Sequence, residues 1–204
     1  MRTFTALLIA VALFTATLCL EGCAMPARST AMAVNAGSDL TITAHDSYYR
    51  RLAVTSVEGG HKTAALERSG VSNEEFRPAL EHSLRASGYL ADDSAAASVD
   101  LSARIVRLDR PSFASTMTVT SVVRYRTVTR ATGAALLDAT LEAKGSAGVS
   151  DAFLGPKRLR LAEEASIRAN IECLLKVLRT RASTTEVRRD SASGGATQIR
   201  RCDG

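Results

Sequence analysis

The sequence predicts an α+β domain of two layers, in which two helices pack on one face of a mainly antiparallel sheet, in the order β-α-β-β-β-α. Two segments, near residues 72–88 and 155–180, repeat apolar residues every three to four positions, which is typical of helices. Three segments between them alternate apolar and polar residues, as half-buried strands do. The 204 residues are 46% hydrophobic but only 4% aromatic with no Trp, which indicates one domain with an aliphatic core.

The first 22 residues have the pattern of a secretory signal peptide. Arg2 gives a short positive start, and an almost continuous apolar run follows over residues 7–18. A helix that spans a membrane needs roughly 20 apolar residues, and this run is shorter. We therefore expect residues 1–22 to be removed during export.

The end of this run resembles the bacterial lipobox, in which Leu stands three positions before an invariant Cys and a small residue stands one before it. Leu20, Gly22 and Cys23 occupy these positions, whereas Glu21 departs from the usual small or apolar residue. The motif implies that Cys23 becomes an acylated first residue, with chains such as palmitate, and two or more acyl chains anchor a protein stably. Ala24 then implies sorting to the outer membrane. The alternative is cleavage after Ala24, which releases a soluble periplasmic protein.

Residues 23–47 show no sustained period and are predicted to form a lipidated tether, with a short strand over residues 39–44. The α+β domain is predicted to span residues 48–180. Its first strand covers residues 52–57 and ends at Gly59 and Gly60, which break regular structure.

The first helix has a clear start and end. Ser72 and Glu75 form a capping-box pattern, and Gly88 is placed to end the helix in a left-handed conformation. Pro78 departs from this pattern because it removes a backbone hydrogen bond inside the helix. The apolar stripe consists of Phe76, Leu80 and Leu84.

A three-stranded meander is predicted over residues 98–108, 115–129 and 137–143, with a turn at Thr132 and Gly133. At about 3.3 Å per residue, the middle strand would span roughly 50 Å, so it must bend, bulge or project. Its polar face is either solvated or a docking surface for a partner. That face is predicted to carry Thr118, Thr120, Val122, Arg124, Arg126, Thr140, Glu142 and Lys144.

The last helix is predicted to begin at Gly155 and Pro156, where the missing N–H of proline matters least, and to end near residue 180. Residues 181–204 have no apolar stripe and are predicted to be a disordered tail. Cys173 lies in the helix and Cys202 in the tail. We expect two free thiols, although an oxidising compartment would permit their pairing.

Three basic residues, Lys157, Arg158 and Arg160, lie at the start of this helix, where the helix dipole disfavours cations. Together with free N–H groups they form a candidate site for a phosphate or carboxylate. The alternative is a solvated basic turn that is neutralised by Glu163 and Glu164.

No catalytic pattern stands out. The three histidines, His45, His61 and His82, have no spacing typical of a metal site, and nucleophile-elbow, P-loop and dinucleotide motifs are absent from the sequence. We therefore predict no metal, no cofactor, no catalytic residue and no enzymatic activity. The net charge of +5 is spread among interspersed acids, which favours a generally basic surface over a surface dedicated to anionic partners such as phospholipid heads, lipopolysaccharide phosphates or acidic proteins. We expect no nucleic-acid partner.

The order of elements behind the lipobox resembles small α+β lipoproteins of the bacterial envelope, such as the lipopolysaccharide-assembly lipoprotein. Four segments between about residues 52 and 178 look like those of an uncharacterised proteobacterial lipoprotein family. The resemblance implies a non-catalytic accessory or assembly factor, anchored through Cys23 to the outer membrane on its periplasmic face, with an envelope protein complex or a glycolipid as partner. The alternative is a periplasmic binder of a small apolar or anionic ligand. The segments are Phe76-Arg-Pro-Ala-Leu80, Leu108-Asp-Arg-Pro111, Met117-Thr-Val-Thr120 and Arg158-Leu-Arg-Leu-Ala162.

Overall fold

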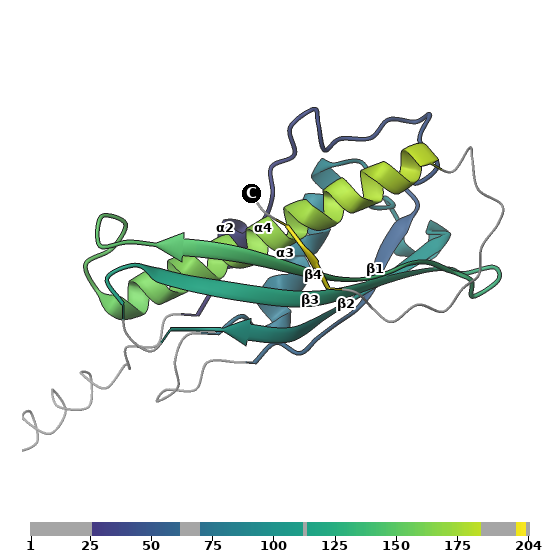
Figure 1. Cartoon of the computed structure of the whole chain (residues 1–204). Coiled ribbons are helices and arrows are strands. Elements are labelled where there is room, and N and C mark those ends of the chain that lie inside the picture. Colours follow the sequence, from purple (N-terminus) through teal and green to yellow (C-terminus); the bar gives the residue numbers. More distant parts are fainter. Residues whose placement is uncertain (1–25, 62–69, 112–113, 185–198, 203–204) are drawn as a thin grey trace, which may run out of the picture.

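The computed structural model describes residues 26–61, 70–111, 114–184 and 199–202 (Figure 1). The signal peptide and Cys23 lie outside these residues. The helices are α2 (Ser29–Met32), α3 (Asn73–Ala86) and α4 (Gly155–Thr184), with a short 3-10 helix at Ser94–Ala96. The strands are β1 (Leu52–Glu58), β2 (Val99–Asp109), β3 (Met117–Thr129), β4 (Ala135–Ala147) and β5 (Ile199–Arg201).

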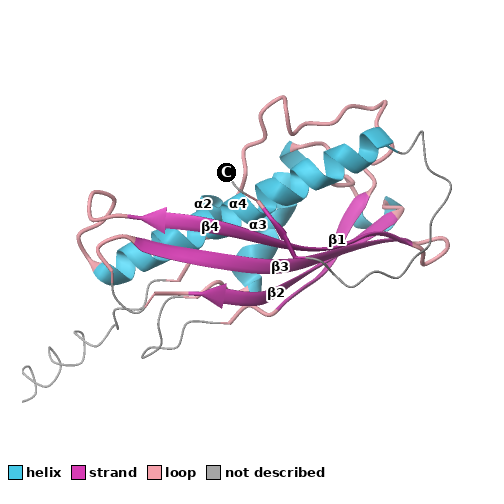
Figure 2. Cartoon of the chain, viewed as in Figure 1, coloured by secondary structure: helices cyan, strands magenta, loops and turns pink. Residues whose placement is uncertain are grey.

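The five strands form one sheet in the order β1-β2-β3-β4-β5. The two inner pairings, β2 with β3 and β3 with β4, are antiparallel, whereas β1 is parallel to β2 and β5 is parallel to β4. The sheet is therefore mixed, and the predicted mainly antiparallel sheet holds only for its centre. The helices α3 and α4 lie on the same side of the sheet, which leaves its other side open (Figure 2).

The predicted alternation along the meander is confirmed, with two exceptions. Leu101, Tyr125 and Leu141 are buried beneath the helices, and Arg124 points to the open side. Val122 and Thr140, both predicted on the wet face, are only 1% and 6% exposed.

The 13 residues of β3 would span about 43 Å and pair with β4 from Met117↔Ala147 to Val128↔Ala135, with a register shift after Thr127. The length is thus accommodated by bulges and by a long ribbon whose first three residues extend past β2.

The helix α3 is capped as predicted at both ends. The Ser72 hydroxyl accepts a hydrogen bond from the Glu75 N–H at 3.2 Å, and Gly88 follows the helix with φ of +83°. The Glu75 carboxylate instead accepts from the backbone N–H of Ser29 at 2.6 Å, so the expected capping-box side chain ties α2 to α3. Pro78 stands inside a continuous helix.

The predicted tether is wrong for most of its length, because residues from Ala27 onward belong to the folded unit. Ala27, Met32 and Leu40 are buried in the core, and the backbone N–H of Ala27 donates to the Gly70 carbonyl at 3.3 Å. Residues 39–44 contain a turn and no strand. This segment crosses the ends of several elements in an irregular path, so its buried residues follow no period that a sequence pattern would reveal.

The predicted tail is also partly wrong. The helix α4 continues to Thr184, and β5 pairs with β4 at the sheet edge. Cys202 follows β5, and its N–H donates to the Glu142 carbonyl at 2.9 Å, which places the thiol beside α4. Cys173 and Cys202 form a disulfide across a Cα–Cα distance of 6.0 Å, so the expected free thiols are a wrong prediction.

The helix α4 is held on the sheet by close backbone contact and a buried polar network. A Cβ added to Gly145 would lie 2.1 Å from the Ser166 nitrogen, so only glycine permits this approach of β4 to α4. The Asn170 amide donates to the carbonyls of Ser121 and Leu141 at 3.2 and 3.0 Å, and its oxygen accepts from the Tyr125 hydroxyl at 3.0 Å.

Candidate functional site

The open side of the sheet carries most of the charged side chains that the strands contribute. No described helix covers it (Figure 2). Several of its charges form ion pairs, one within β2 and the others between neighbouring strands or strand ends, as expected for a solvated face. The pairs are Arg107 with Asp109 at 2.7 Å, Arg130 with Asp100 at 2.7 Å, and Arg201 with Glu142 at 3.4 Å.

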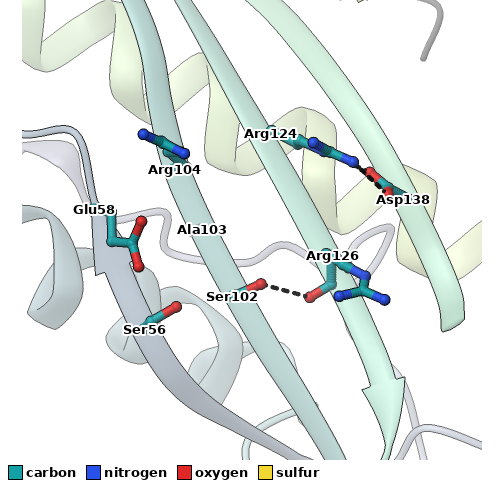
Figure 3. A pocket seen from close by; sticks show the side chains of 8 residues that line it. All are labelled: Ser56, Glu58, Ser102, Ala103, Arg104, Arg124, Arg126 and Asp138. Atoms are coloured by element: carbon teal, nitrogen blue, oxygen red, sulfur yellow. Dashed lines mark hydrogen bonds and ion pairs between the residues drawn. The ribbon is translucent and has the colours of Figure 1, made fainter. Parts of the chain in front are cut away.

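A shallow polar hollow of about 340 Å³ lies on this face (Figure 3). Glu58 and Ser56 of β1 stand at one side, Ser102 and Arg104 of β2 between, and the Arg124–Asp138 pair of β3 and β4 at the other. The hollow is lined by Ser56, Glu58, Ser102, Ala103, Arg104, Arg124, Arg126 and Asp138.

Within the hollow, only one of the three arginines is fully engaged. Arg124 Nε and Nη2 reach the two Asp138 oxygens at 2.8 and 2.7 Å, and this hydrogen bonding holds the pKa of Asp138 below its usual value. Among the described residues, Arg104 and Arg126 have no carboxylate within ion-pair distance. Two guanidinium groups therefore remain at the rim for a carboxylate or phosphate.

The predicted anion site at the start of α4 does not form one cluster. Arg158 Nη1 donates to the carbonyls of Ala152 and Phe153 at 3.0 and 2.6 Å, while Arg160 Nε lies 3.6 Å from Glu164. Of the three, only Lys157 is exposed, and Arg158 and Arg160 are half-buried. The alternative, a basic turn neutralised by nearby glutamates, describes Arg160 better than a shared anion does.

Two adjacent buried carboxylates on α4 are absent from the predicted sites. Glu164 accepts from the backbone N–H and Nε of Arg28 at 3.0 and 3.3 Å. Glu163 lies 2.6 Å from Arg110 Nε in an ion pair without hydrogen-bond geometry, and burial raises the pKa of Glu163 to about 8. Such a pKa is common in active sites. Glu163 is however 0% exposed, which leaves no room for a substrate, so we assign it to joining α4 to the end of β2.

The histidines do not assemble into a site. His82 Nε2 lies 3.4 Å from Asn35 Oδ1 between α3 and the N-terminal segment, and His61 borders a separate hollow beside Arg110. Over the residues that the structure describes, no group of three His, Cys, Asp or Glu side chains is arranged to hold a metal ion. In the same residues, no helix combines the length and apolar character needed to cross a membrane.

The comparisons with known proteins define the fold. No protein-family model matches the sequence, and no curated protein matches it significantly. The structure is similar to that of the Xanthomonas campestris protein XCC0632, of family DUF330, with a TM-score of 0.52, 10% identity, and coverage of 72% of this chain and 93% of that one. The chain therefore has an α+β fold that a DUF330 protein shares.

Two further solved structures are more distant. A hypothetical protein from Chlamydia trachomatis gives a TM-score of 0.45 at 14% identity, over 65% of this chain and 96% of its own. A minor lipoprotein from Acinetobacter baumannii gives a TM-score of 0.38 at 17% identity, over 68% and 93%.

Proposed function

We propose that this protein is a non-catalytic, lipid-anchored accessory protein of the bacterial cell envelope, held through Cys23 on the periplasmic face of the outer membrane. The observation that carries the proposal is the position of the folded unit. Its first buried residue, Ala27, stands four positions after Cys23, and four residues span at most about 14 Å. An acylated Cys23 would therefore hold the domain directly at the bilayer surface.

The open side of the sheet supports an accessory role better than an enzymatic one. It offers a broad charged surface with a shallow hollow. Among the described residues, the one carboxylate whose pKa is strongly raised, Glu163, is buried on α4 and away from this surface. A charged open surface of this kind suits contact with an envelope protein complex or a glycolipid. The lipobox, the α+β fold shared with the DUF330 protein and this surface together favour an assembly or transport accessory.

The test compares the full chain with a Cys23→Ala variant expressed in a Gram-negative host. We expect the wild type to begin at Cys23, to carry acyl mass and to fractionate with the outer membrane, whereas the variant carries none. The measured mass of the product decides the result. Fractionation alone does not, because an uncleaved precursor that keeps its signal peptide would also stay with the membranes. A wild-type product without acyl groups that starts at Met25 would overturn the proposal in favour of a soluble periplasmic protein.

A second candidate function is the binding of a small anionic ligand in the hollow. It is favoured by the guanidinium groups of Arg104 and Arg126, which have no carboxylate within ion-pair distance in the described part of the chain. An NMR titration with inorganic phosphate tests it. We expect saturable shifts near Ser102 that an Arg104→Ala/Arg126→Ala double variant abolishes and that Lys144→Ala, on the same face outside the hollow, retains. Shifts that spread over the basic surface without saturating would exclude this function.

A further inference from the structure

The loop between β4 and α4 exposes an unusual group of apolar side chains. Phe153, Leu154 and Val149 are 85%, 58% and 51% exposed, and they lie within six residues of one another. Single exposed apolar residues are ordinary, but a group of them marks a surface that contacts a membrane or another molecule. Elsewhere in the described chain, the large side chains of Phe76, Tyr89 and Tyr125 are fully buried, and Val106 and Ile199 are exposed only singly.

The loop backbone is fixed by hydrogen bonds, so these side chains are held outward. Gly148 N–H donates to the Asp151 carboxylate at 2.7 Å, and Asp151 N–H donates to the Gly148 carbonyl at 3.1 Å. Arg158 then binds the carbonyls of Ala152 and Phe153 from the first turn of α4. Arg158, predicted as part of an anion site, thus holds the backbone of the apolar tip in place.

The first described residues of the chain and this loop lie toward the same end of α4. The N–H of Arg28, one residue after the first buried position, binds Glu164 of α4. Glu164 lies nine residues after Gly155, the start of α4, which is about 14 Å along the helix axis. The chain from Ala27 back to Cys23 can extend by a similar length. Figure 1 shows the first described residues toward the same end of the molecule as this loop.

We propose that residues 148–154 form a membrane-contact loop, which inserts Phe153 and Leu154 into the interface of the bilayer that holds the anchor. The exposed Lys157 stands beside them for contact with anionic headgroups, and Arg158, whose described hydrogen bonds go to backbone carbonyls and not to a carboxylate, adds a second positive charge on the same turn. The one acid of the loop, Asp151, is bound by the Gly148 N–H. This inference rests on the proposed lipid anchor. Attachment at two points would fix the orientation of the domain on the membrane.

The absence of Trp from the sequence allows a sharp test. A Phe153→Trp variant of the full lipidated chain carries a single Trp in the loop, and Ile199→Trp is a matched control at another exposed apolar position, on β5. Each is reconstituted into vesicles of phosphatidylethanolamine and phosphatidylglycerol with or without brominated acyl chains. We expect Phe153→Trp emission to shift to the blue and to lose most of its intensity with brominated lipid, and Ile199→Trp emission to stay unchanged. Adding Leu154→Asp to the Phe153→Trp chain should reverse both effects.

The outcomes separate this inference from the anchor itself. Unquenched Phe153→Trp emission from a chain that carries acyl mass and floats with the vesicles would overturn the membrane-contact loop and leave the anchor standing. Equal quenching at both positions would also overturn it, since the loop would then have no special contact. A chain without acyl mass would refute the anchor instead. A blue shift that appears only with envelope extract, and never with lipid alone, would assign the loop to a protein partner and overturn the membrane inference.

Discussion

The two sides of the sheet use polar residues in opposite ways, although the same strands supply both. Beneath α4, Ser121, Tyr125 and Asn170 are buried and joined by hydrogen bonds. On the open side, Arg124 and Asp138 form a pair that is partly exposed, and Arg104 stands without an ion-pair partner among the described residues. A buried polar group left without a partner costs about 1–3 kcal/mol, whereas an exposed ion pair contributes roughly 0–1 kcal/mol.

This difference indicates which residues the fold requires and which remain available for function. Polar groups under α4 are constrained by the position of the helix, so a substitution there should lower the free energy of unfolding. Charged groups on the open side contribute little to folding, so their arrangement can vary with whatever the surface binds. This distinction would be wrong if substitutions on the two sides of the sheet lowered the free energy of unfolding by the same amount.

The largest effect is expected where β4 touches α4. A Gly145→Ala substitution places a Cβ 2.1 Å from the Ser166 nitrogen and 2.6 Å from the Ala162 carbonyl oxygen, and neither backbone atom can move without lifting the helix. We expect a loss of about 4 kcal/mol or more in the free energy of unfolding, or no folded protein. Gly148→Ala is the matched control, because its Cβ would meet side-chain atoms only at 3.6 Å or beyond. Equal stability of the two variants in thermal melts would show that α4 does not pack this closely.

A smaller effect is expected from the polar network itself. Asn170→Leu removes two donors and one acceptor and leaves the Tyr125 hydroxyl and the Leu141 carbonyl buried without their partner. We expect a loss of about 2–3 kcal/mol in urea unfolding. Arg124→Leu on the other side of β3 is the control, and its unfolding should be close to that of the wild type because its partner Asp138 can be hydrated. A control that loses as much as Asn170→Leu would break the distinction between the two sides.

Features that depend on neighbours in the sequence could be predicted. The alternation in β2, β3 and β4, the Ser72 cap and Gly88 all follow from local pattern, and the structure confirms them. Features that depend on long-range placement could not. Glu75 matched the pattern of a capping box, but its carboxylate accepts a hydrogen bond from the backbone N–H of Ser29 at the N-terminus of α2 instead.

The same reason explains the missed parts of the chain and of the site. The N-terminal segment buries Met32 without any periodic pattern of apolar residues, and β5 is only three residues long. Neither segment therefore has a sequence pattern that distinguishes it from the polar residues around it. On the open face, the pattern indicated which side Arg124 and Arg126 occupy. It gave no indication of the hollow, because that depends on the register of β1 against β2 and on Glu58 and Ser56.

The smallest predicted effect concerns pH and sharpens the contrast between two carboxylates. Burial raises the pKa of Glu163 to about 8 from a usual 4.5, whereas hydrogen bonds from Arg124 lower the pKa of Asp138. Above pH 4.5 the unfolded chain releases the Glu163 proton and the folded protein keeps it, so stability should fall as pH rises toward 8. The Asp138 contribution has the opposite sign, because it is lost only as pH falls below the usual value near 3.8.

Urea unfolding of wild type and Glu163→Gln at pH 6 and pH 8 tests this contrast. We expect the wild type to lose about 2 kcal/mol relative to the variant over that interval, because one unit of pH corresponds to about 1.4 kcal/mol for a group that stays protonated only when folded. Glutamine keeps the shape of the side chain and cannot ionise. Subtracting the unfolding free energy of the variant from that of the wild type at each pH therefore cancels the titration of all other groups. Asp138→Asn is the control from the open side and should run parallel to the wild type, since that carboxyl is already ionised throughout the interval. Parallel curves for wild type and Glu163→Gln would mean that the ion pair with Arg110 at 2.6 Å outweighs burial and keeps Glu163 charged in the folded protein.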